Sequence, residues 1–269
     1  YIGSNAMVLI GDKFLFNDKI LDKEEFLKVY CYSSNNVYEV IRIMDSKILF
    51  WEDHFKRLKN SIFKFNGKDI GIDDLLQKIN IVINVNKIDS GNLKIEFVFD
   101  DYKCKLYIYP IKFYYPDKEM WVDVITFNIE RENPNVKTYN YDFKTKVQKI
   151  INENNVYEIV LVNKQGFITE GSRTNVYFIK DNCFFTAPEN IVLKGVTRMK
   201  VNKIINELGF VLVEESVFKK DIFKFDACFL TSTSSNVLPV NKIDGLCMNS
   251  LSNMYLKEVM YSFEEYLKK

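Results

Sequence analysis

The chain has 269 residues, a length that suits two modest domains or one large one. A hydrophobic fraction of 47% and a charged fraction of 27% are typical of a globular protein and exclude a disordered one. The formal net charge of +1 gives no reason to expect nucleic acid or a membrane as a partner. The sequence shows no apolar run of membrane-spanning length and no secretory signal.

The five cysteines are odd in number, widely spaced and without a Cys-x-x-Cys motif, so we expect reduced thiols in a cytoplasmic protein. His54 is the single histidine of the chain, which excludes zinc sites built from several histidines, and we expect no metal site. It lies at an apparent helix start, where we expect a structural or surface role. If the protein is an enzyme, proton transfer therefore falls to a lysine, a tyrosine or a carboxylate.

The first part of the chain alternates predicted strands and helices. Residues 1–6, before Met7, resemble sequence left by an expression vector and are set aside. The predicted elements are a hairpin of residues 8–10 and 13–16, a hairpin of 37–44 and 47–51, helices from about 53 and over 72–83, and paired strands 93–99 and 103–111.

Residues 115–119 are polar, contain a proline and separate two strand-like runs, so they form the expected linker. It divides an N-terminal domain of residues 7–114 from a C-terminal domain of residues 120–269. The elements predicted beyond it are strands 121–127, 157–162, 167–169, 175–179, 183–186 and 227–230, a helix capped by Asp142, a helix over 198–208 capped by Thr197, and a closing helix from about 250. Helices and strands in blocks of both kinds favour an α+β fold.

Three segments of the second half carry residues suited to one kind of ligand. Glu170 follows a strand-like run and could bond a ring nitrogen. Gly195 and Thr197 precede a helical pattern, whose N-terminus attracts anions. Residues 231–235 supply five consecutive hydroxyls, which could bind phosphate or a carboxylate.

Taken singly, each of these segments has an ordinary explanation: a strand-end acid, a capped helix, and a loop closed by side-chain hydrogen bonds. Together, a carboxylate, a helix N-terminus and a hydroxyl cup are what a pyridine ring bearing a phosphate requires. They predict an enzyme that uses pyridoxal 5'-phosphate.

The motifs, taken in order, resemble those of the class IV (fold type IV) pyridoxal phosphate enzymes, which include branched-chain and D-amino-acid aminotransferases and aminodeoxychorismate lyases. The resemblance runs from about residue 8 to residue 245 and covers nearly the whole chain. The matching segments are 37–42, 51–58, 136–140, 169–175, 193–198 and 231–240. The resemblance implies a two-domain fold like that of D-amino-acid aminotransferase, with the cofactor between the domains, and a homodimer.

The resemblance also implies roles for individual residues. Lys137 falls in the segment that carries the Schiff-base lysine and is the expected catalytic residue. The residues implied for cofactor binding are Arg57, Val196, Thr197 and Thr233 on the phosphate and Glu170 on the pyridine nitrogen. Tyr38 matches an active-site tyrosine near the cofactor, and Ser234 is expected on the substrate carboxylate.

The sequence departs from the family pattern at two places that concern the substrate. Many members carry an arginine that reads the substrate carboxylate on the strand matching residues 95–101, and this strand has none. The Gly-Asp-Gly often found before the Tyr-Glu signature is replaced by Ser34-Asn35-Asn36. Arg173 is the nearby cation that could partly substitute for the missing arginine.

We therefore expect a transaminase of amino-acid metabolism that moves an amino group between an amino acid and a 2-oxo acid through a Schiff base on Lys137. One alternative is an aminodeoxychorismate lyase that releases pyruvate with the same lysine. Another is a cofactor-binding protein without catalysis, which the missing arginine would favour. A third is a soluble domain that binds some other phosphorylated ligand. The sequence fixes neither the amino donor nor its stereochemistry.

Overall fold

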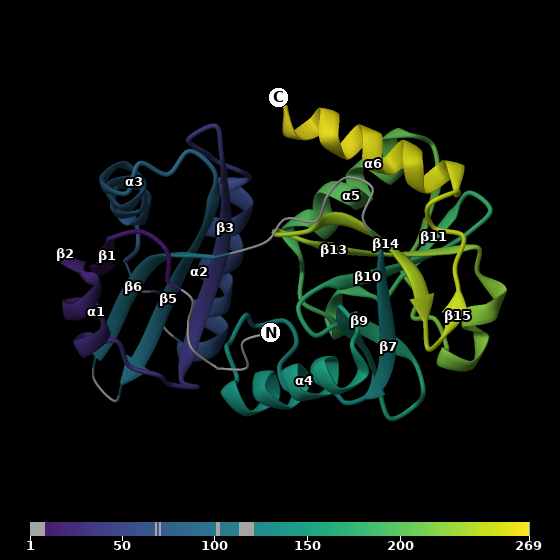
Figure 1. Ribbon diagram of the computed structural model, residues 1–269, viewed down its shortest axis with the longest axis horizontal. Coiled ribbons are helices and arrows are strands. Elements are labelled where there is room, and N and C mark those ends of the chain that lie inside the picture. Colours follow the sequence, from purple (N-terminus) through teal and green to yellow (C-terminus); the bar gives the residue numbers. More distant parts are fainter. Residues whose placement is uncertain (1–8, 68, 70, 101–102, 113–120, 269) are drawn as a thin grey trace. The chain divides into compact units, whose positions relative to one another are not determined.

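The computed structural model of the protein describes residues 9–67, 69, 71–100, 103–112 and 121–268. The chain divides into two compact units (Figure 1): Tyr1–Tyr114 with Val136–Thr145, and Tyr115–Asn135 with Lys146–Lys269. The expected linker at 115–119, the leading residues 1–6 and Val8 of the first predicted hairpin lie outside the described residues.

The first unit is built on a six-stranded antiparallel sheet with the strand order β2-β1-β6-β5-β3-β4. Its strands are β1 (Lys13–Phe16), β2 (Lys19–Asp22), β3 (Asn36–Met44), β4 (Lys47–Ile48), β5 (Gly91–Asp100) and β6 (Lys103–Ile111). Side chains alternate between the two faces of such a sheet. Val37, Glu39 and Ile41 of β3 are therefore buried on one face, whereas Tyr38 and Val40 point to the other.

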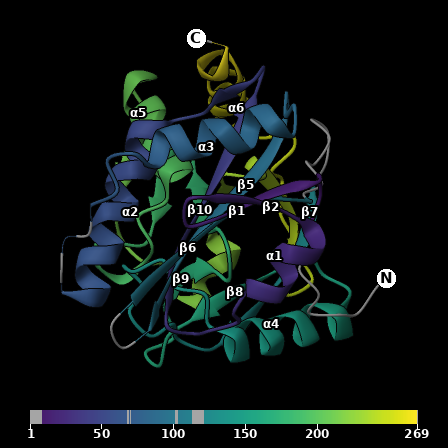
Figure 2. The ribbon, with the colours of Figure 1, turned by 90° about the vertical axis from the view of Figure 1, so that its left-hand side faces the viewer.

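The two faces of this sheet are covered by different helices: α1 (Lys23–Val29), α2 (Trp51–Asn66) and α3 (Leu75–Val85). Helices α2 and α3 bury their apolar sides in the same core as Val37, Ile41 and Ile95, and Figure 2 shows α3 lying across the strands. Helix α1 contributes Phe26 to a second cluster, which is rich in aromatic side chains; the Phe26 ring centroid lies 5.0 Å from that of Phe14.

The predicted hairpin of residues 8–10 and 13–16 is wrong. Strand β1 pairs instead with β2, through a two-residue turn in which Asn17 adopts a φ of 53°, a conformation that asparagine tolerates. Leu9 forms an isolated bridge with Ile111. The turn at Gly11 does not close a hairpin. The N–H groups of Asp12 and Lys13 donate instead to Asn86 Oδ1, each at 3.0 Å.

The second unit contains a nine-stranded sheet with the order β12-β11-β10-β13-β14-β7-β8-β9, and β15 pairs with β14 outside this path. The strands are β7 (Val122–Asn128), β8 (Glu158–Val162), β9 (Ile168–Gly171), β10 (Asn175–Lys180), β11 (Cys183–Thr186), β12 (Val211–Val213), β13 (Ala227–Ser232), β14 (Asn236–Ile243) and β15 (Leu246–Cys247). Strands β14, β7 and β8 run parallel to one another. Their apolar side chains, with those of β9, β10 and β13, form one continuous core.

The helices of the second half are α4 (Tyr141–Asn154), α5 (Val196–Glu207) and α6 (Met254–Leu267), with short 3-10 turns at Glu189–Ile191 and Lys219–Lys224. Helices α5 and α6 pack against each other (Figure 1). Sheets and helices in these blocks confirm the α+β prediction. No helix among the residues described here is both long and apolar enough to cross a membrane.

Two predicted helix caps are wrong. Asn140, and not Asp142, caps α4, because its Oδ1 accepts a hydrogen bond from Phe143 N at 2.9 Å. Helix α5 has Gly195 as its N-cap, so Thr197 lies in its first turn. Both helices begin earlier than their apolar periodicity alone suggests.

We predict that Ser250→Ala lowers the free energy of unfolding by about 1–3 kcal/mol, because it leaves a buried N–H without an acceptor. Ser250 Oγ is buried, accepts from Cys228 N of β13 at 3.0 Å and lies 2.6 Å from Val240 O of β14. Urea unfolding measures the effect. The exposed Ser252→Ala is the matched control, and equal losses from the two variants would contradict the prediction.

Candidate active site

The segment that carries Lys137 is fixed along the edge of β3. Tyr38 N donates to Lys137 O at 2.9 Å. One residue pair further on, Asn36 Oδ1 accepts from Tyr139 N at 2.8 Å and Asn36 Nδ2 donates to Tyr139 O at 3.0 Å. The Lys137 ammonium lies 4.9 Å from the centroid of the Tyr38 ring. The structure thus brings together two residues that the sequence predicted for the site.

Arg57 of α2 forms a buried ion pair with Glu39 of β3. Its Nε donates to Glu39 Oε2 at 2.9 Å and its Nη2 to Glu39 Oε1 at 2.5 Å. This fork holds the guanidinium in one orientation. An arginine oriented in this way keeps its positive charge at a fixed place, which suits it to attract an anion.

His54 completes the surroundings of Glu39, with its Nδ1 3.2 Å from Glu39 Oε1. Burial on its own would raise the pKa of Glu39, but the Arg57 guanidinium and His54 outweigh it and hold the pKa well below its usual range. Burial lowers the pKa of His54, and Glu39 opposes that effect. The single histidine of the chain is therefore a buried neighbour of the Arg57 site.

Glu170 ends strand β9 in the second unit and is almost fully buried. Its Oε1 accepts from Arg131 Nη1 at 2.9 Å, and its Oε2 accepts from Leu193 N at 3.0 Å. A carboxylate beside a cation stays ionised. It can therefore act as the acceptor for a protonated ring nitrogen, as the sequence predicts.

The turn after Glu170 is wrapped around a second buried acid, Glu158 of β8. Ser172 Oγ donates to Glu158 Oε1 at 2.6 Å, and Arg173 N donates to Glu158 Oε2 at 3.2 Å. A Cβ on Gly171 would collide with Thr174 Oγ1, so a larger residue here would displace the Thr174 hydroxyl, which donates to Glu158 Oε2. Glu158 thereby fixes the end of β9.

Arg173 is engaged at the surface of the second unit. Its Nη2 donates to Tyr157 O at 2.9 Å, its Nε lies 3.7 Å from Glu158 Oε2, and its guanidinium stacks over the Tyr157 ring at 4.9 Å. The side chain is about half exposed. These contacts account for Arg173 without a substrate.

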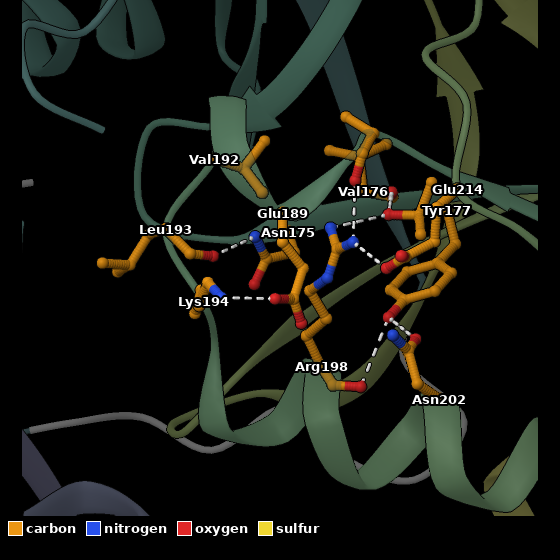
Figure 3. A network of polar contacts seen from close by, with 12 residues as sticks. Asn175, Val176, Tyr177, Glu189, Val192, Leu193, Lys194, Arg198, Asn202 and Glu214 are labelled. Atoms are coloured by element: carbon orange, nitrogen blue, oxygen red, sulfur yellow. Dashed lines mark hydrogen bonds and ion pairs between the residues drawn. The ribbon is translucent and has the colours of Figure 1, made fainter. Parts of the chain in front are cut away.

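The loop that leads into α5 is held by two asparagines. Asn175 Nδ2 donates to Leu193 O at 3.0 Å (Figure 3). Asn135 Nδ2 donates to Val192 O at 2.6 Å. A Cβ on Gly195 would collide with Asn175 Oδ1, so a larger residue here would displace this amide and its hydrogen bond to Leu193 O. The N-terminus of α5 is therefore held in place from outside the helix.

Arg198, in the first turn of α5, is fully buried and fixes the helix to the strands behind it (Figure 3). Its Nη2 donates to Ala187 O at 2.7 Å and to Glu214 Oε1 at 2.9 Å, and its Nη1 donates to Thr186 Oγ1 at 3.2 Å. Because its guanidinium donates to these partners, we assign Arg198 to holding the start of the helix and not to binding an anion.

The predicted hydroxyl cluster lies where β13 turns into β14. Thr231 and Ser232 belong to the end of the strand, and residues 233–235 form the turn. Ser232 Oγ lies 2.6 Å from Ser235 Oγ and accepts from Ser235 N at 2.9 Å. Thr233 and Ser234 are half-buried in this turn. The turn is thus closed by hydroxyls that neighbour, but are not, the two residues predicted to bind ligands.

The residues present fit a phosphorylated pyridine cofactor. Helix α5 opens with Gly195, which has no side chain to cap the N–H groups of Val196 and Thr197, so these amides suit a phosphate. Thr231 Oγ1 is buried without a hydrogen-bond partner among the residues the structure describes. Glu170 offers a buried carboxylate.

Sequence reasoning missed three residues that hold the predicted ones: Arg131, Glu158 and Asn175. Arg131 lies 39 positions before its partner Glu170, and no local pattern connects them. Glu158 had a signal, since it opens the otherwise apolar strand Glu158–Val162. The remaining predicted residues divide between the units: Arg57 lies with Lys137 in the first, and Thr197 with Glu170 in the second.

Comparison with known proteins identifies the fold first. A solved branched-chain amino acid aminotransferase of Escherichia coli has the same fold, with a TM-score of 0.84 and 22% sequence identity over 95% of this chain and 94% of that one. That fold is the one found in fold type IV pyridoxal phosphate enzymes. The model of the family "Amino-transferase class IV" matches residues 36–243. The chain belongs to this family of aminotransferases, which use pyridoxal 5'-phosphate.

Two curated relatives cover most of the chain. A D-alanine aminotransferase of Bacillus licheniformis is 28% identical over 263 residues, which are 88% of this chain and 90% of that protein. A Methanocaldococcus jannaschii protein with the provisional name branched-chain-amino-acid aminotransferase is 28% identical over 282 residues, 95% of each. The prediction of a class IV aminotransferase is thus confirmed.

We predict that Arg131→Met lowers the free energy of unfolding by about 2–3 kcal/mol, because it leaves the Glu170 carboxylate buried without its cation. Chemical denaturation measures the loss. Lys149→Met is the control, since the ammonium of Lys149 pairs with Glu153 at 3.8 Å on the exposed surface and such pairs contribute less than about 0.5 kcal/mol. A change as small as that of the control would show that Glu170 does not depend on Arg131.

The Glu39 ion pair predicts a pH-dependent stability. A carboxyl whose pKa is lowered on folding stabilises the protein above its unfolded pKa of about 4.3 and loses that contribution as the pH falls below it. Glu39→Gln should therefore cost about 2–3 kcal/mol at pH 7 and progressively less below about pH 4. Unfolding curves recorded at pH 7 and below about pH 4 test this prediction. The exposed Glu153→Gln is the control. A cost that does not change with pH would contradict it.

Proposed function

We propose that Lys137 is the catalytic residue of this pyridoxal-phosphate-dependent aminotransferase. The supporting observation is the placement of its side chain. The segment around Lys137 is hydrogen-bonded along β3, and its ammonium faces the ring of Tyr38 at 4.9 Å. A lysine held at an element junction beside an aromatic ring is suited to form a covalent bond with an aldehyde cofactor.

Bound pyridoxal phosphate supplies an electron-withdrawing ring that stabilises negative charge at the substrate α-carbon. The Lys137 amine would take up the proton that leaves this α-carbon and deliver it to C4′ of the cofactor, so that the amino group stays with the cofactor. Tyr38 limits the positions that the Lys137 side chain can adopt. The reaction moves an amino group from an amino acid to a 2-oxo acid.

The residues proposed to hold the cofactor act on its two charged ends. Glu170, which pairs with Arg131, would accept a hydrogen bond from the ring nitrogen. The N–H groups of Val196 and Thr197 at the start of α5 bind the phosphate, and the helix dipole favours its negative charge. Arg57 and the Thr233 hydroxyl supply further donors. These are the contacts that fix the ring for chemistry.

The donor proposed for this enzyme is D-alanine or a branched-chain amino acid, because proteins named for these activities are similar to the chain over most of its length. We also propose a cytoplasmic homodimer. Ser234 and Tyr38 are proposed to contact the substrate, and Arg173 stays a prediction. The lyase alternative would use the same lysine, and release of pyruvate from aminodeoxychorismate without an amino acceptor would identify it.

We predict that Lys137→Ala lowers turnover by at least about 10³-fold, because it removes the proton-transferring amine. In the wild type, borohydride reduction should fix the cofactor to the peptide containing Lys137, as peptide mass spectrometry will show. The near-ultraviolet and visible spectrum should change on addition of the amino donor. Lys149→Ala, an exposed lysine on α4, serves as control. Label on any other lysine, or normal turnover of Lys137→Ala, would overturn the assignment.

A further inference from the structure

A second lysine of the first unit is buried, on the strand where the sequence showed no arginine. Lys94 of β5 is only 8% exposed. Lysines are rarely buried to this extent, because the ammonium group loses its hydration. Burial lowers the pKa of Lys94, and the neighbouring Glu96 opposes this effect. A buried ammonium group requires partners that replace its lost hydration. The identity of these partners indicates the role of Lys94.

The partner of Lys94 is Glu96, two residues along the same strand and therefore on the same face of the sheet. Lys94 Nζ lies 3.1 Å from Glu96 Oε2. The same oxygen accepts hydrogen bonds from Tyr30 Oη at 2.7 Å and from Tyr109 Oη at 2.8 Å. The two tyrosines fix Glu96, and Glu96 in turn fixes the Lys94 ammonium.

The rest of the Lys94 ammonium group faces aromatic rings. Its Nζ lies 4.5 Å from the centroid of the Tyr139 ring, 5.1 Å from that of Tyr38 and 5.7 Å from that of Tyr109. Ring faces attract a cation without neutralising it. An ammonium has three N–H groups, and a bond to Glu96 accounts for one of them. The cluster thus holds a cation that can still donate to an anion.

Lys94 and the proposed catalytic lysine, Lys137, have one aromatic neighbour in common. The Tyr38 ring lies 5.1 Å from Lys94 Nζ and 4.9 Å from Lys137 Nζ, so both ammonium groups lie against one ring. An α-amino acid carries its carboxylate on the same carbon as the amino group that reacts. A substrate whose amino group reacts at Lys137 therefore has its carboxylate near the Tyr38 ring, which the Lys94 ammonium also approaches.

We propose that the ammonium group of Lys94, held by Glu96, binds the carboxylate of the amino-acid substrate. The proposal rests on the proposed function, in that it takes Lys137 as the site of reaction. Arg173 is less suited, because its guanidinium is already engaged by Tyr157 and Glu158 in the second unit. The strand without an arginine thus carries its cation at position 94.

The test measures binding and needs no turnover. Calorimetry of the cofactor-loaded protein with 4-methylpentanoate and with its uncharged amide gives the preference for a carboxylate. Lys94→Met should reduce that preference by about 10- to 100-fold, the range expected for losing a hydrogen bond to a charged group. Lys94→Arg, which keeps the charge, should retain most of it.

The outcomes separate this proposal from a structural role and from the proposed function. If Lys94 only balances Glu96, Lys94→Met will weaken the carboxylate and the amide equally, and the proposal fails. Unchanged carboxylate binding by Lys94→Met would also overturn it. Failure of the transaminase assignment shows separately, as a wild-type spectrum that ignores every amino acid while the carboxylate still binds.

Discussion

Burial of acidic side chains is the constraint on which both units depend. Four glutamates, namely Glu39, Glu96, Glu158 and Glu170, are each no more than 3% exposed. A buried carboxylate is tolerated only where cations or hydrogen-bond donors replace the lost water. Arg57 compensates Glu39, Lys94 compensates Glu96, and Arg131 compensates Glu170. Glu158 is compensated by hydroxyl and N–H groups of the turn that follows β9. Three of the residues proposed for chemistry, Arg57, Glu170 and Lys94, are one of these acids or a partner of one.

The sequence predicted those parts of the molecule that local patterns determine. Long strands such as β3 and β5 and the helix after Trp51 follow from alternation and from 3.6-residue periodicity. The hairpin at β1 could not be predicted, because the Gly11 turn is bound by Asn86, more than seventy residues away. The N-cap of α5 was misplaced for a similar reason, since contact with Asn175 selects Gly195 there.

The candidate site shows the same division between local and distant information. Lys137 and Glu170 were predicted through motifs, which record the identity of a residue but not its partners. Lys94 and Glu96 form a polar pair inside a strand that reads as an ordinary alternating run. The surroundings of this pair are formed by Tyr30 at the end of α1, Tyr109 of β6 and Tyr139 after Lys137. Only the folded sheet brings these tyrosines together. Substrate recognition is therefore the function least accessible from the sequence.

The order in which the chain visits its two units has a consequence for its synthesis. Residues 136–145 belong to the first unit, although the second unit has begun before them. A nascent chain released at about 5–20 residues per second therefore exposes the edge of β3 until Lys137 and Tyr139 have left the ribosome. The hydrogen-bond partner of Asn36, Tyr139, is synthesised 103 residues later. The first unit is therefore complete only after residues 136–145 have been synthesised, and a chain cut at residue 114 would lack them.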